Sequence, residues 1–198
     1  VLPHVIHLAC TTEPICRQRE KVVPLAAGRV LEVGMGSELN LPHYDPDRVD
    51  LVWGLEPSVG MRRKARTNLQ RTRIPVEWLD LPGEEIPLAD DSVDTVLLTY
   101  TLCTIPDWQR ALEQMRRVLK PGGTLLFCEH GAAPDAGVRR WQRRIGPLWR
   151  RVAGGCHLDR PIPRCLVEGG FGIREMESGY LPGPGFATFN YRGAARPR

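Results

Sequence analysis

Two glycines and a glutamate are spaced like the residues of a nucleotide-binding site. Gly34 and Gly36 follow the apolar run 29–33, and Glu56 comes 22 positions after Gly34, at the end of the apolar run 50–55. Glycines let the backbone approach a ligand closely and adopt positive φ at little cost. A carboxylate at the end of the second run can accept hydrogen bonds from both hydroxyls of a ribose. The alternative is that Glu56 caps the following helix or is simply solvated.

The same glycine segment argues against two common nucleotide sites. A dinucleotide fingerprint needs a third glycine at the position of Leu39, so pyrophosphate binding and a nicotinamide oxidoreductase are disfavoured. The sequence also lacks the Gly-Lys-Ser/Thr triplet of a phosphate-binding P-loop. The ligand expected here therefore has a ribose but no dinucleotide pyrophosphate.

Two histidines are candidates for a general base. His130 follows the apolar run 124–128, and His157 lies in a Gly-Gly-Cys-His segment. Imidazole titrates near neutral pH, so either side chain could take a proton from a substrate. The alternative for each is a hydrogen bond that holds its own loop. Cys156 could be a reactive thiol, although only neighbouring arginines would lower its pKa.

The six cysteines show neither metal-site nor disulfide-framework spacing. No pair is separated as Cys-x-x-Cys, and His157 beside Cys156 has no second ligand pair at zinc-site spacing. A chain of this length can build its own core without disulfides. We therefore interpret the cysteines as reduced, mostly buried thiols of a cytoplasmic protein and expect no metal.

Composition indicates one globular domain over residues 1–198. The chain is 42% hydrophobic and 25% charged, which is near the globular average. Its formal net charge of +4 is too small to indicate nucleic acid as a partner. The longest nearly uncharged apolar run, 95–105, is about half of the roughly 20 residues that a membrane-spanning helix needs.

Strand and helix patterns alternate along the chain, which is typical of a parallel sheet covered on both faces. This order predicts an α/β fold with a doubly wound sheet of about seven strands. We expect helices at 1–22, 59–71 and 107–119, with Asp107 as an N-cap, and strands at 29–33, 50–55, 76–79, 94–101, 124–128, 173–177 and 186–191.

Four blocks of the sequence resemble class I S-adenosylmethionine-dependent methyltransferases. They are Glu-Val-Gly-Met-Gly at 32–36, Leu-Glu-Pro at 55–57 and the segments 86–94 and 118–123, in the family's order and spacing. The segments 101–104, 129–130, 154–157 and 186–192 look like the small type 11 branch, which includes alkyl-thiol methyltransferases and bacterial relatives. The resemblance implies a Rossmann-like, mostly parallel sheet with an antiparallel last strand and helices on both faces.

The resemblance also implies S-adenosylmethionine as cofactor, with S-adenosylhomocysteine as product. Within one domain, 1–28 would be a helical lead-in, 29–130 the cofactor-binding core, and 131–198 a substrate lid with the final strand pair. The implied contacts are Glu32, Gly34 and Gly36 at the methionine end, Glu56 and Pro57 at the ribose, Leu81, Pro82, Gly83 and Glu84 at the adenine, and Thr99 and Leu102 beside the transferable methyl.

We expect methyl transfer in line to a small, rather apolar acceptor, with a thiol as the first candidate. A lipid or quinone acceptor is the alternative within the class. A second alternative is a module that binds S-adenosylmethionine without catalysis, because Glu38 replaces the third small residue of the family's glycine pattern. There it would crowd or repel the cofactor or point out to solvent.

The segment from Arg139 to Arg151 carries six arginines around Trp141 and Trp149. It has three interpretations: a solvated basic helix, a weak contact with a membrane surface, or contact with RNA, for which no recognisable module is present. We expect the stretch 161–172 to pack against this helix and complete the substrate lid.

Overall fold

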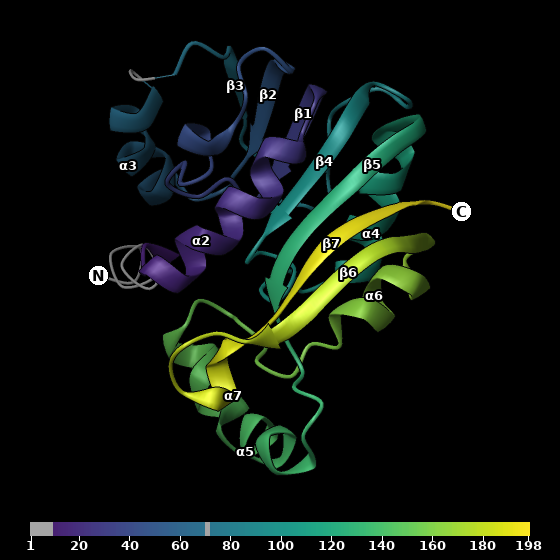
Figure 1. Cartoon of the computed structure of the whole chain (residues 1–198). Coiled ribbons are helices and arrows are strands. Elements are labelled where there is room, and N and C mark those ends of the chain that lie inside the picture. The colour runs from purple at the N-terminus through teal and green to yellow at the C-terminus, as the bar shows by residue number, and fades with distance from the viewer. Residues whose placement is uncertain (1–9, 70–71) are drawn as a thin grey trace.

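Seven runs of apolar and β-branched residues pair into one sheet in the order β3-β2-β1-β4-β5-β7-β6 (Figure 1). The computed structural model describes residues 10–69 and 72–198. Strands β1 to β5 are parallel, and β7 is antiparallel to both of its neighbours, β5 and β6. This arrangement confirms the predicted fold class. The strands are β1 (Gly28–Val33), β2 (Val49–Leu55), β3 (Val76–Leu79), β4 (Val93–Thr99), β5 (Leu119–His130), β6 (Phe171–Tyr180) and β7 (Phe189–Pro197).

The central strand β4 is buried on both faces, as its continuous apolar run predicts. Val96 and Leu98 point into the core on one side of the sheet, and Leu97 points into the core on the other. All three side chains are fully buried. Two hydrophobic layers therefore hold the centre of the sheet in place, which fixes the loop that follows β4.

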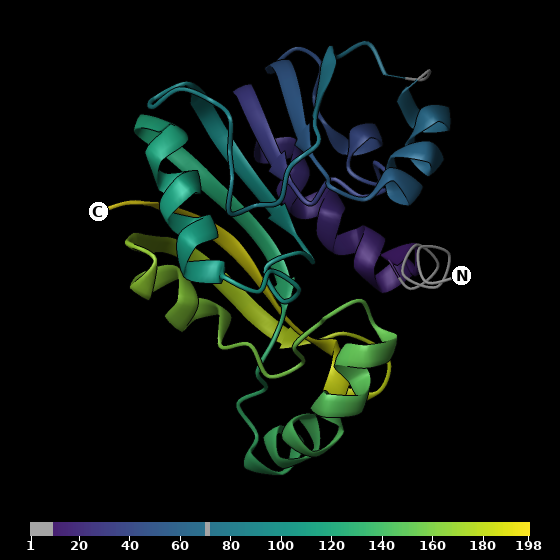
Figure 2. The same ribbon diagram turned by 180° about the vertical axis from the view of Figure 1, so that it is seen from behind.

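Helices cover both faces of the sheet (Figure 2). Helix α2 (Glu13–Val22) lies on one face, and α4 (Trp108–Val118) and α6 (Ile162–Glu168) lie on the other. The predicted N-cap of α4 is confirmed, because the Asp107 carboxylate accepts a hydrogen bond of 3.0 Å from the Arg110 amide. Helix α3 (Val59–Leu69) and the short 3₁₀ turns η1 (Val23–Leu25) and η2 (Leu41–His43) complete the covering of the β1–β3 side.

Helices α5 (Ala136–Val152) and α7 (Gly185–Thr188) lie beyond the sheet, past the carboxyl ends of β4 and β5 (Figure 1). Ligands of open α/β sheets bind at this edge. The C-terminal third of the chain therefore contributes to the ligand-binding edge as well as to the sheet. Among the described residues, no helix is both long and apolar enough to cross a membrane.

Two expectations about the C-terminal third were wrong. A strand does not begin at Phe186, because residues 185–188 form α7 after Pro184, and β7 begins only at Phe189. Helix α6 packs against β6 and α4 and not against α5, whereas the place of this segment in a substrate lid stays a prediction. Its Ile162 and Leu166 are buried in the core with α4 and β5, and this burial draws the segment onto the sheet. The start of the predicted lead-in helix, residues 1–9, and the predicted end of the helix 59–71 lie outside the described residues.

Candidate active site

The glycine loop after β1 approaches the loop after β4 so closely that a side chain has no room. Gly34 has φ +71°, in the left-handed region that favours glycine, and its amide donates to the Leu55 carbonyl at 2.8 Å. A Cβ atom on Gly34 would lie 2.3 Å from Cγ2 of Thr101. The glycine therefore lets two strand ends meet at the ligand-binding edge.

Glu56, directly after β2, holds this loop through both carboxylate oxygens. Its Oε2 accepts the Gly36 amide at 2.9 Å, and its Oε1 accepts the Ser58 amide at 2.8 Å. Burial raises the pKa of Glu56, and these two amides lower it in part. Each carboxylate oxygen can accept further hydrogen bonds, so the same group can hold the loop and bind a diol.

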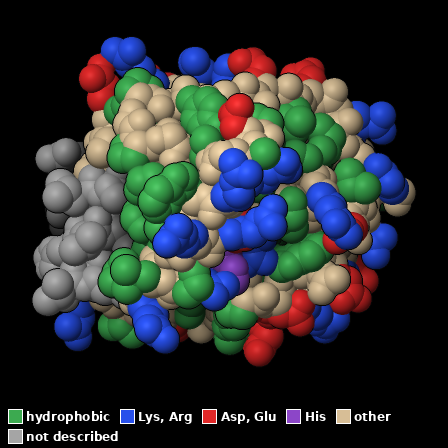
Figure 3. Space-filling model, turned by 90° about the horizontal axis from the view of Figure 1, so that it is seen from below, with side chains coloured by type: hydrophobic (Ala, Val, Ile, Leu, Met, Phe, Trp, Pro, Cys, Tyr) green, Lys and Arg blue, Asp and Glu red, His purple; other side chains and the backbone are tan. Residues whose placement is uncertain are grey.

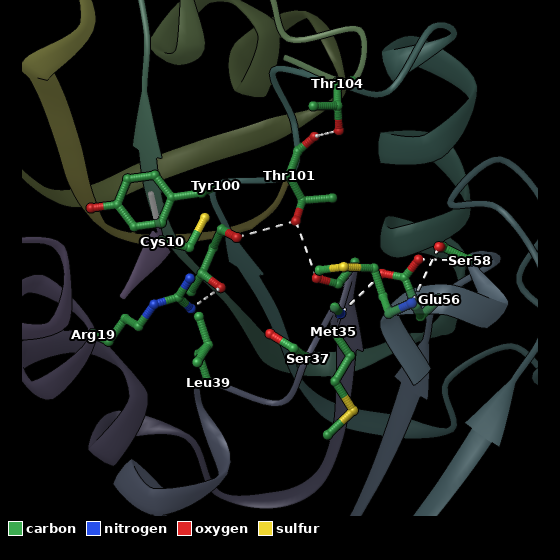
Figure 4. Close-up of a pocket in the computed structure, with 15 residues that line it drawn as sticks. Cys10, Arg19, Met35, Ser37, Leu39, Glu56, Ser58, Tyr100, Thr101 and Thr104 are labelled. Atoms are coloured by element: carbon green, nitrogen blue, oxygen red, sulfur yellow. Dashed lines mark hydrogen bonds between the residues drawn. The ribbon is translucent and has the colours of Figure 1, made fainter. Parts of the chain in front are cut away.

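Glu56 and the glycine loop line a cavity of about 330 Å³ (Figure 4). Four of the expected cofactor contacts border it, namely Gly34, Gly36, Glu56 and Thr99. The remaining walls come from both sides of the sheet edge. They are formed by Cys10, Arg19, Met35, Ser37, Leu39, Ser58, Met61, Tyr100, Thr101, Thr104 and Gly154.

Glu32 lies beneath the cavity and does not line it. It is almost completely buried, and its two oxygens accept hydrogen bonds of 2.7 Å from the Asn40 amide group and from the Tyr44 hydroxyl. Burial raises the pKa of Glu32 to about 7 against the lowering effect of these two donors. Its place in the structure is that of a support for the residues around the cavity.

Arg19 on α2 joins the hydrogen bonds around Glu32, and its role was not expected from the sequence. Its Nη1 donates to Oδ1 of Asn40 at 2.5 Å and to Oγ1 of Thr99 at 2.8 Å. The guanidinium also lies over the Tyr100 ring, 5.3 Å from its centroid. Helix α2 also carries Arg17 and Lys21, and nothing in the sequence indicates which of these basic side chains is buried at a site.

Tyr100 lies between this first cavity, which we call the cofactor cavity because four expected cofactor contacts border it, and a second cavity. Its backbone has φ +55°, which is uncommon for a residue with a large side chain. The hydroxyl donates to Oδ1 of Asn190 on β7 at 2.9 Å, and this bond holds the ring between the two spaces. Tyr100, Cys10 and Thr104 line both cavities, which therefore adjoin.

The second cavity has a volume of about 370 Å³ and mostly apolar walls. Its size lies within the range of small-molecule sites. The walls come from α2, the loop after β4, α5 with the loop after it, and the connection between β6 and β7. Apart from the three shared residues, they comprise Thr12, Pro14, Ile15, Cys103, His130, Trp149, Ala153, Cys156, Leu158, Leu181, Pro182, Pro184, Ala187, Thr188 and Asn190.

Three side chains with reactive atoms meet in the wall of this second cavity. Nε2 of His130 lies 3.1 Å from Sγ of Cys156, and the ligand atoms of Cys103, His130 and Cys156 all lie within 4.8 Å of one another. The pKa of Cys156 is lowered, chiefly by hydrogen bonds from the Cys103 thiol and from His130. Burial lowers the pKa of His130, but contact with Cys156 outweighs it and leaves the pKa raised.

The other predicted residues lie elsewhere. His157 borders a different hollow, together with Trp108 and Arg160. Glu38 is completely buried with φ +62°, so the alternative that it points out to solvent was wrong. It is also absent from the walls of the cofactor cavity, so the alternative that it crowds or repels the cofactor stays a prediction. The walls of the cofactor cavity also do not include Pro57, Leu81, Pro82, Gly83, Glu84 or Leu102, whose cofactor contacts stay predictions.

Comparison with known proteins identifies the family. Residues 31–127 match a family model described as a methyltransferase domain. A phosphatidylethanolamine N-methyltransferase from Cereibacter sphaeroides is 35% identical over 143 residues, which are 71% of this chain and 68% of that protein. The chain belongs to the class I S-adenosylmethionine-dependent methyltransferases.

Other relatives of this methyltransferase chain carry further names. Thiol S-methyltransferase TMT1B of Homo sapiens is 34% identical over 159 residues, which are 77% of this chain and 64% of that protein. The chain thus spans less than two thirds of that relative. The structure of a methyltransferase from Methanosarcina mazei has a TM-score of 0.65 at 20% identity, covering 85% of this chain and 92% of that one, and it shows the shared fold.

The cofactor cavity of this methyltransferase chain fits the cofactor that its family implies. The loop presents two glycines with positive φ, and both border the cavity, so backbone lines the space where a ligand would lie. The Glu56 carboxylate is positioned by two amides and borders the cavity, as a ribose acceptor should. The volume of about 330 Å³ is also within the range of ligand sites.

Proposed function

We propose that this protein transfers a methyl group from S-adenosylmethionine to the sulfur of a small, apolar thiol. One observation carries the proposal: an apolar cavity of about 370 Å³ adjoins the cofactor cavity and has ionisable groups in its wall. The thiol S-methyltransferase name of a relative that is 34% identical supports the choice of acceptor.

The chain's task in this reaction is to align two reactants. S-adenosylmethionine, when bound, supplies an electrophilic methyl group on a sulfonium. Tyr100 and Thr104 border both cavities, so an acceptor in the second cavity faces the cofactor across them. Alignment of this kind can lower a barrier by roughly 7–11 kcal/mol. Apolar walls also exclude water from a thiolate whose charge diminishes as it reacts.

The acceptor must lose a proton. His130 is the predicted base that borders the second cavity, which we call the acceptor cavity. A free thiol has a pKa of about 8.5, so modest assistance is enough at neutral pH. We assign this assistance to His130. The other candidate, His157, borders a different hollow, so its position favours it less.

A lipid or quinone acceptor is the second candidate, because relatives include a phosphatidylethanolamine N-methyltransferase and demethylmenaquinone methyltransferases. The cavity volume of about 370 Å³ favours a small molecule over a long acyl or isoprenoid chain. A large acceptor would have to leave most of its tail outside. Only its head group would then reach the cofactor.

A turnover assay separates these candidates. Purified protein is mixed with S-adenosylmethionine and one acceptor at a time: an alkyl thiol, a phenol, a quinol, or vesicles of phosphatidylethanolamine. We expect release of S-adenosylhomocysteine with the thiol alone. Release only with another acceptor would refute the thiol assignment. Binding of S-adenosylmethionine without release from any acceptor would indicate a binding module that does not catalyse transfer.

Weak contact with an anionic membrane surface is a further part of the proposal, supported by α5. Trp141, Leu148 and Val152 lie seven and four positions apart, on one helical face, and each is more than half exposed. Exposed arginines accompany them, and Figure 3, viewed from the α5 side, shows basic and hydrophobic side chains interleaved on this face. Such a face is typical of helices that lie in a membrane interface.

Vesicle sedimentation tests this contact. We expect the protein to sediment with anionic but not with zwitterionic vesicles, and we expect Trp141→Ser with Leu148→Ser to abolish sedimentation. A control with two exposed apolar residues elsewhere, Leu25→Ser with Met176→Ser, should still sediment. Equal behaviour of the two double variants would refute the role of α5.

A further inference from the structure

The cluster of Cys103, His130 and Cys156 has the composition and size of a metal site. Zinc binds cysteine sulfur at about 2.3 Å and histidine nitrogen at about 2.0–2.1 Å in a tetrahedron, which places two sulfurs about 3.8 Å apart and a sulfur and a nitrogen about 3.6 Å apart. The three ligand atoms here already lie within 4.8 Å of one another, and Nε2 of His130 is 3.1 Å from Sγ of Cys156. Changes in these separations of about an ångström would therefore bring the three atoms into coordination.

Three different segments hold these ligands in place. Cys103 lies in the loop after β4, His130 ends β5, and Cys156 follows α5. The His157 amide donates to the Cys103 carbonyl at 2.9 Å and ties two of these segments together. The buried Glu129 carboxylate accepts the amides of Thr101 and Leu102 at 2.8 and 3.1 Å, which fixes the loop that carries Cys103. Hydrogen bonds of the fold thus hold the segments that carry the ligands.

The Trp149 indole nitrogen donates to Sγ of Cys156 at 3.3 Å. Hydrogen bonds to ligand atoms orient them and tune the affinity of metal sites. Trp149 also belongs to the wall of the acceptor cavity, so the cluster and the cavity share this side chain. This arrangement gives one of the three ligands an outer partner.

We propose that Cys103, His130 and Cys156 bind a Zn²⁺ ion whose fourth position faces the acceptor cavity. Two thiolates and an imidazole favour zinc over hard cations such as magnesium or calcium. Three protein ligands with one open position are the pattern of catalytic zinc sites, whereas structural sites have four protein ligands. All three ligands line the apolar cavity, so the open position is directed to the space where the acceptor would lie.

The role of the open position rests on the proposed function, whereas the site itself does not. An acceptor thiol that binds the ion releases its proton to solvent. Its sulfur then forms a bond to the methyl carbon while the bond from that carbon to the sulfonium sulfur breaks, and the electron pair stays on S-adenosylhomocysteine. His130 promotes loss of the acceptor's proton in this scheme by holding the ion that lowers the thiol pKa.

Metal analysis of reduced protein, freed of any affinity tag, tests the site. After exposure to Zn²⁺ and dialysis into metal-free buffer, we expect one zinc per chain. Cys103→Ser and Cys156→Ser should each lose it, and Cys165→Ser should keep it, because Cys165 is a buried free cysteine of α6 outside the cluster. Trp149→Phe should weaken zinc binding about 10- to 100-fold. Trp53→Phe, which removes an indole donor on β2, should leave it unchanged.

Cobalt gives a second readout that needs no variant. Co²⁺ in the wild-type site should show a thiolate-to-metal absorption band, and an alkyl thiol should change the visible bands if the fourth position is open. Absence of zinc from the reduced wild-type protein would overturn the site even if thiols are methylated. So would Cys103→Ser and Cys156→Ser variants that keep as much zinc as the wild type. Bound zinc without methylation of any thiol would refute the proposed acceptor and leave the site standing.

Discussion

Replacement of Glu56 by glutamine tests the assignment of the ribose site with minimal change of shape. Both carboxylate oxygens accept a backbone amide, from Gly36 at 2.9 Å and from Ser58 at 2.8 Å. A glutamine has one oxygen, so its NH₂ group must face one of these two amides, whichever way the side chain is flipped. The variant therefore loses one hydrogen bond to the loop and one acceptor for the ribose.

The size of the effect follows from the charge of the lost acceptor. Hydrogen bonds to charged groups contribute about 1.5–3 kcal/mol. At about 1.4 kcal/mol for each factor of ten, Glu56→Gln should weaken cofactor binding by about 10- to 150-fold. Isothermal titration calorimetry with S-adenosylmethionine and with S-adenosylhomocysteine measures this change. Glu56→Ala should lose at least as much, because it removes both oxygens.

Comparison of the affinities for the two ligands distinguishes a ribose contact from general electrostatic attraction. They share the ribose, but only S-adenosylmethionine carries the sulfonium charge. A ribose contact predicts equal weakening for both, whereas long-range attraction predicts weakening for S-adenosylmethionine alone. Glu20→Gln, which removes one negative charge from the exposed side of α2, should change neither affinity. Unchanged affinity of a folded Glu56→Gln variant, or loss for only one ligand, would refute the assignment.

Three further variants test the support of the site. Gly34→Ala should abolish measurable cofactor binding, because its Cβ atom would lie 2.3 Å from Cγ2 of Thr101. The control Gly122→Ala has the same left-handed strain of about 1–2 kcal/mol but no neighbour within 4 Å, so calorimetry should find its cofactor affinity unchanged. The raised pKa of Glu32 means that its ionisation destabilises the folded wild type as pH rises from 4.5 to about 7, so the free energy of unfolding of Glu32→Gln should rise by about 3 kcal/mol relative to wild type over this range. Urea titrations that give the same difference between the two proteins at both ends of the range would contradict this expectation. His130→Ala should reduce thiol turnover about 100-fold or more and leave the affinity for S-adenosylmethionine intact, and a parallel loss of affinity in calorimetry would show that His130 supports the cofactor cavity instead.

Local patterns in the sequence were sufficient for the positions of most strands and for the glycine loop. The strand expected at 76–79 is β3, residue for residue, and Asp107 caps α4 as its side chain and position predict. Gly34, Gly36 and Glu56 border one cavity because parallel strands end at the same edge of a sheet. These features depend on short-range periodicity and on topology, which a sequence displays directly.

The support beneath the cavity could not be predicted in the same way. Arg19 on α2 bonds Thr99 at the end of β4, and Tyr100 bonds Asn190 on β7. Each contact joins residues 80 or more positions apart. A buried arginine and a tyrosine with positive φ are also exceptions to the preferences of their residue types, so pattern rules assign them elsewhere.

The cluster of Cys103, His130 and Cys156 shows why spacing in the sequence is a poor guide to a site whose residues come from separate segments. Sequence spacing finds ligands that a single loop or helix brings together, and by that criterion the cysteines carried no metal signal. Cys103, His130 and Cys156 come from three segments that meet only because β4 and β5 are neighbours and α5 packs beyond their ends. The sheet edge that brings the glycines to Glu56 also brings these three side chains to one wall of the acceptor cavity. The two cavities therefore have one structural cause, and a change that displaced the loop after β4 would disturb both.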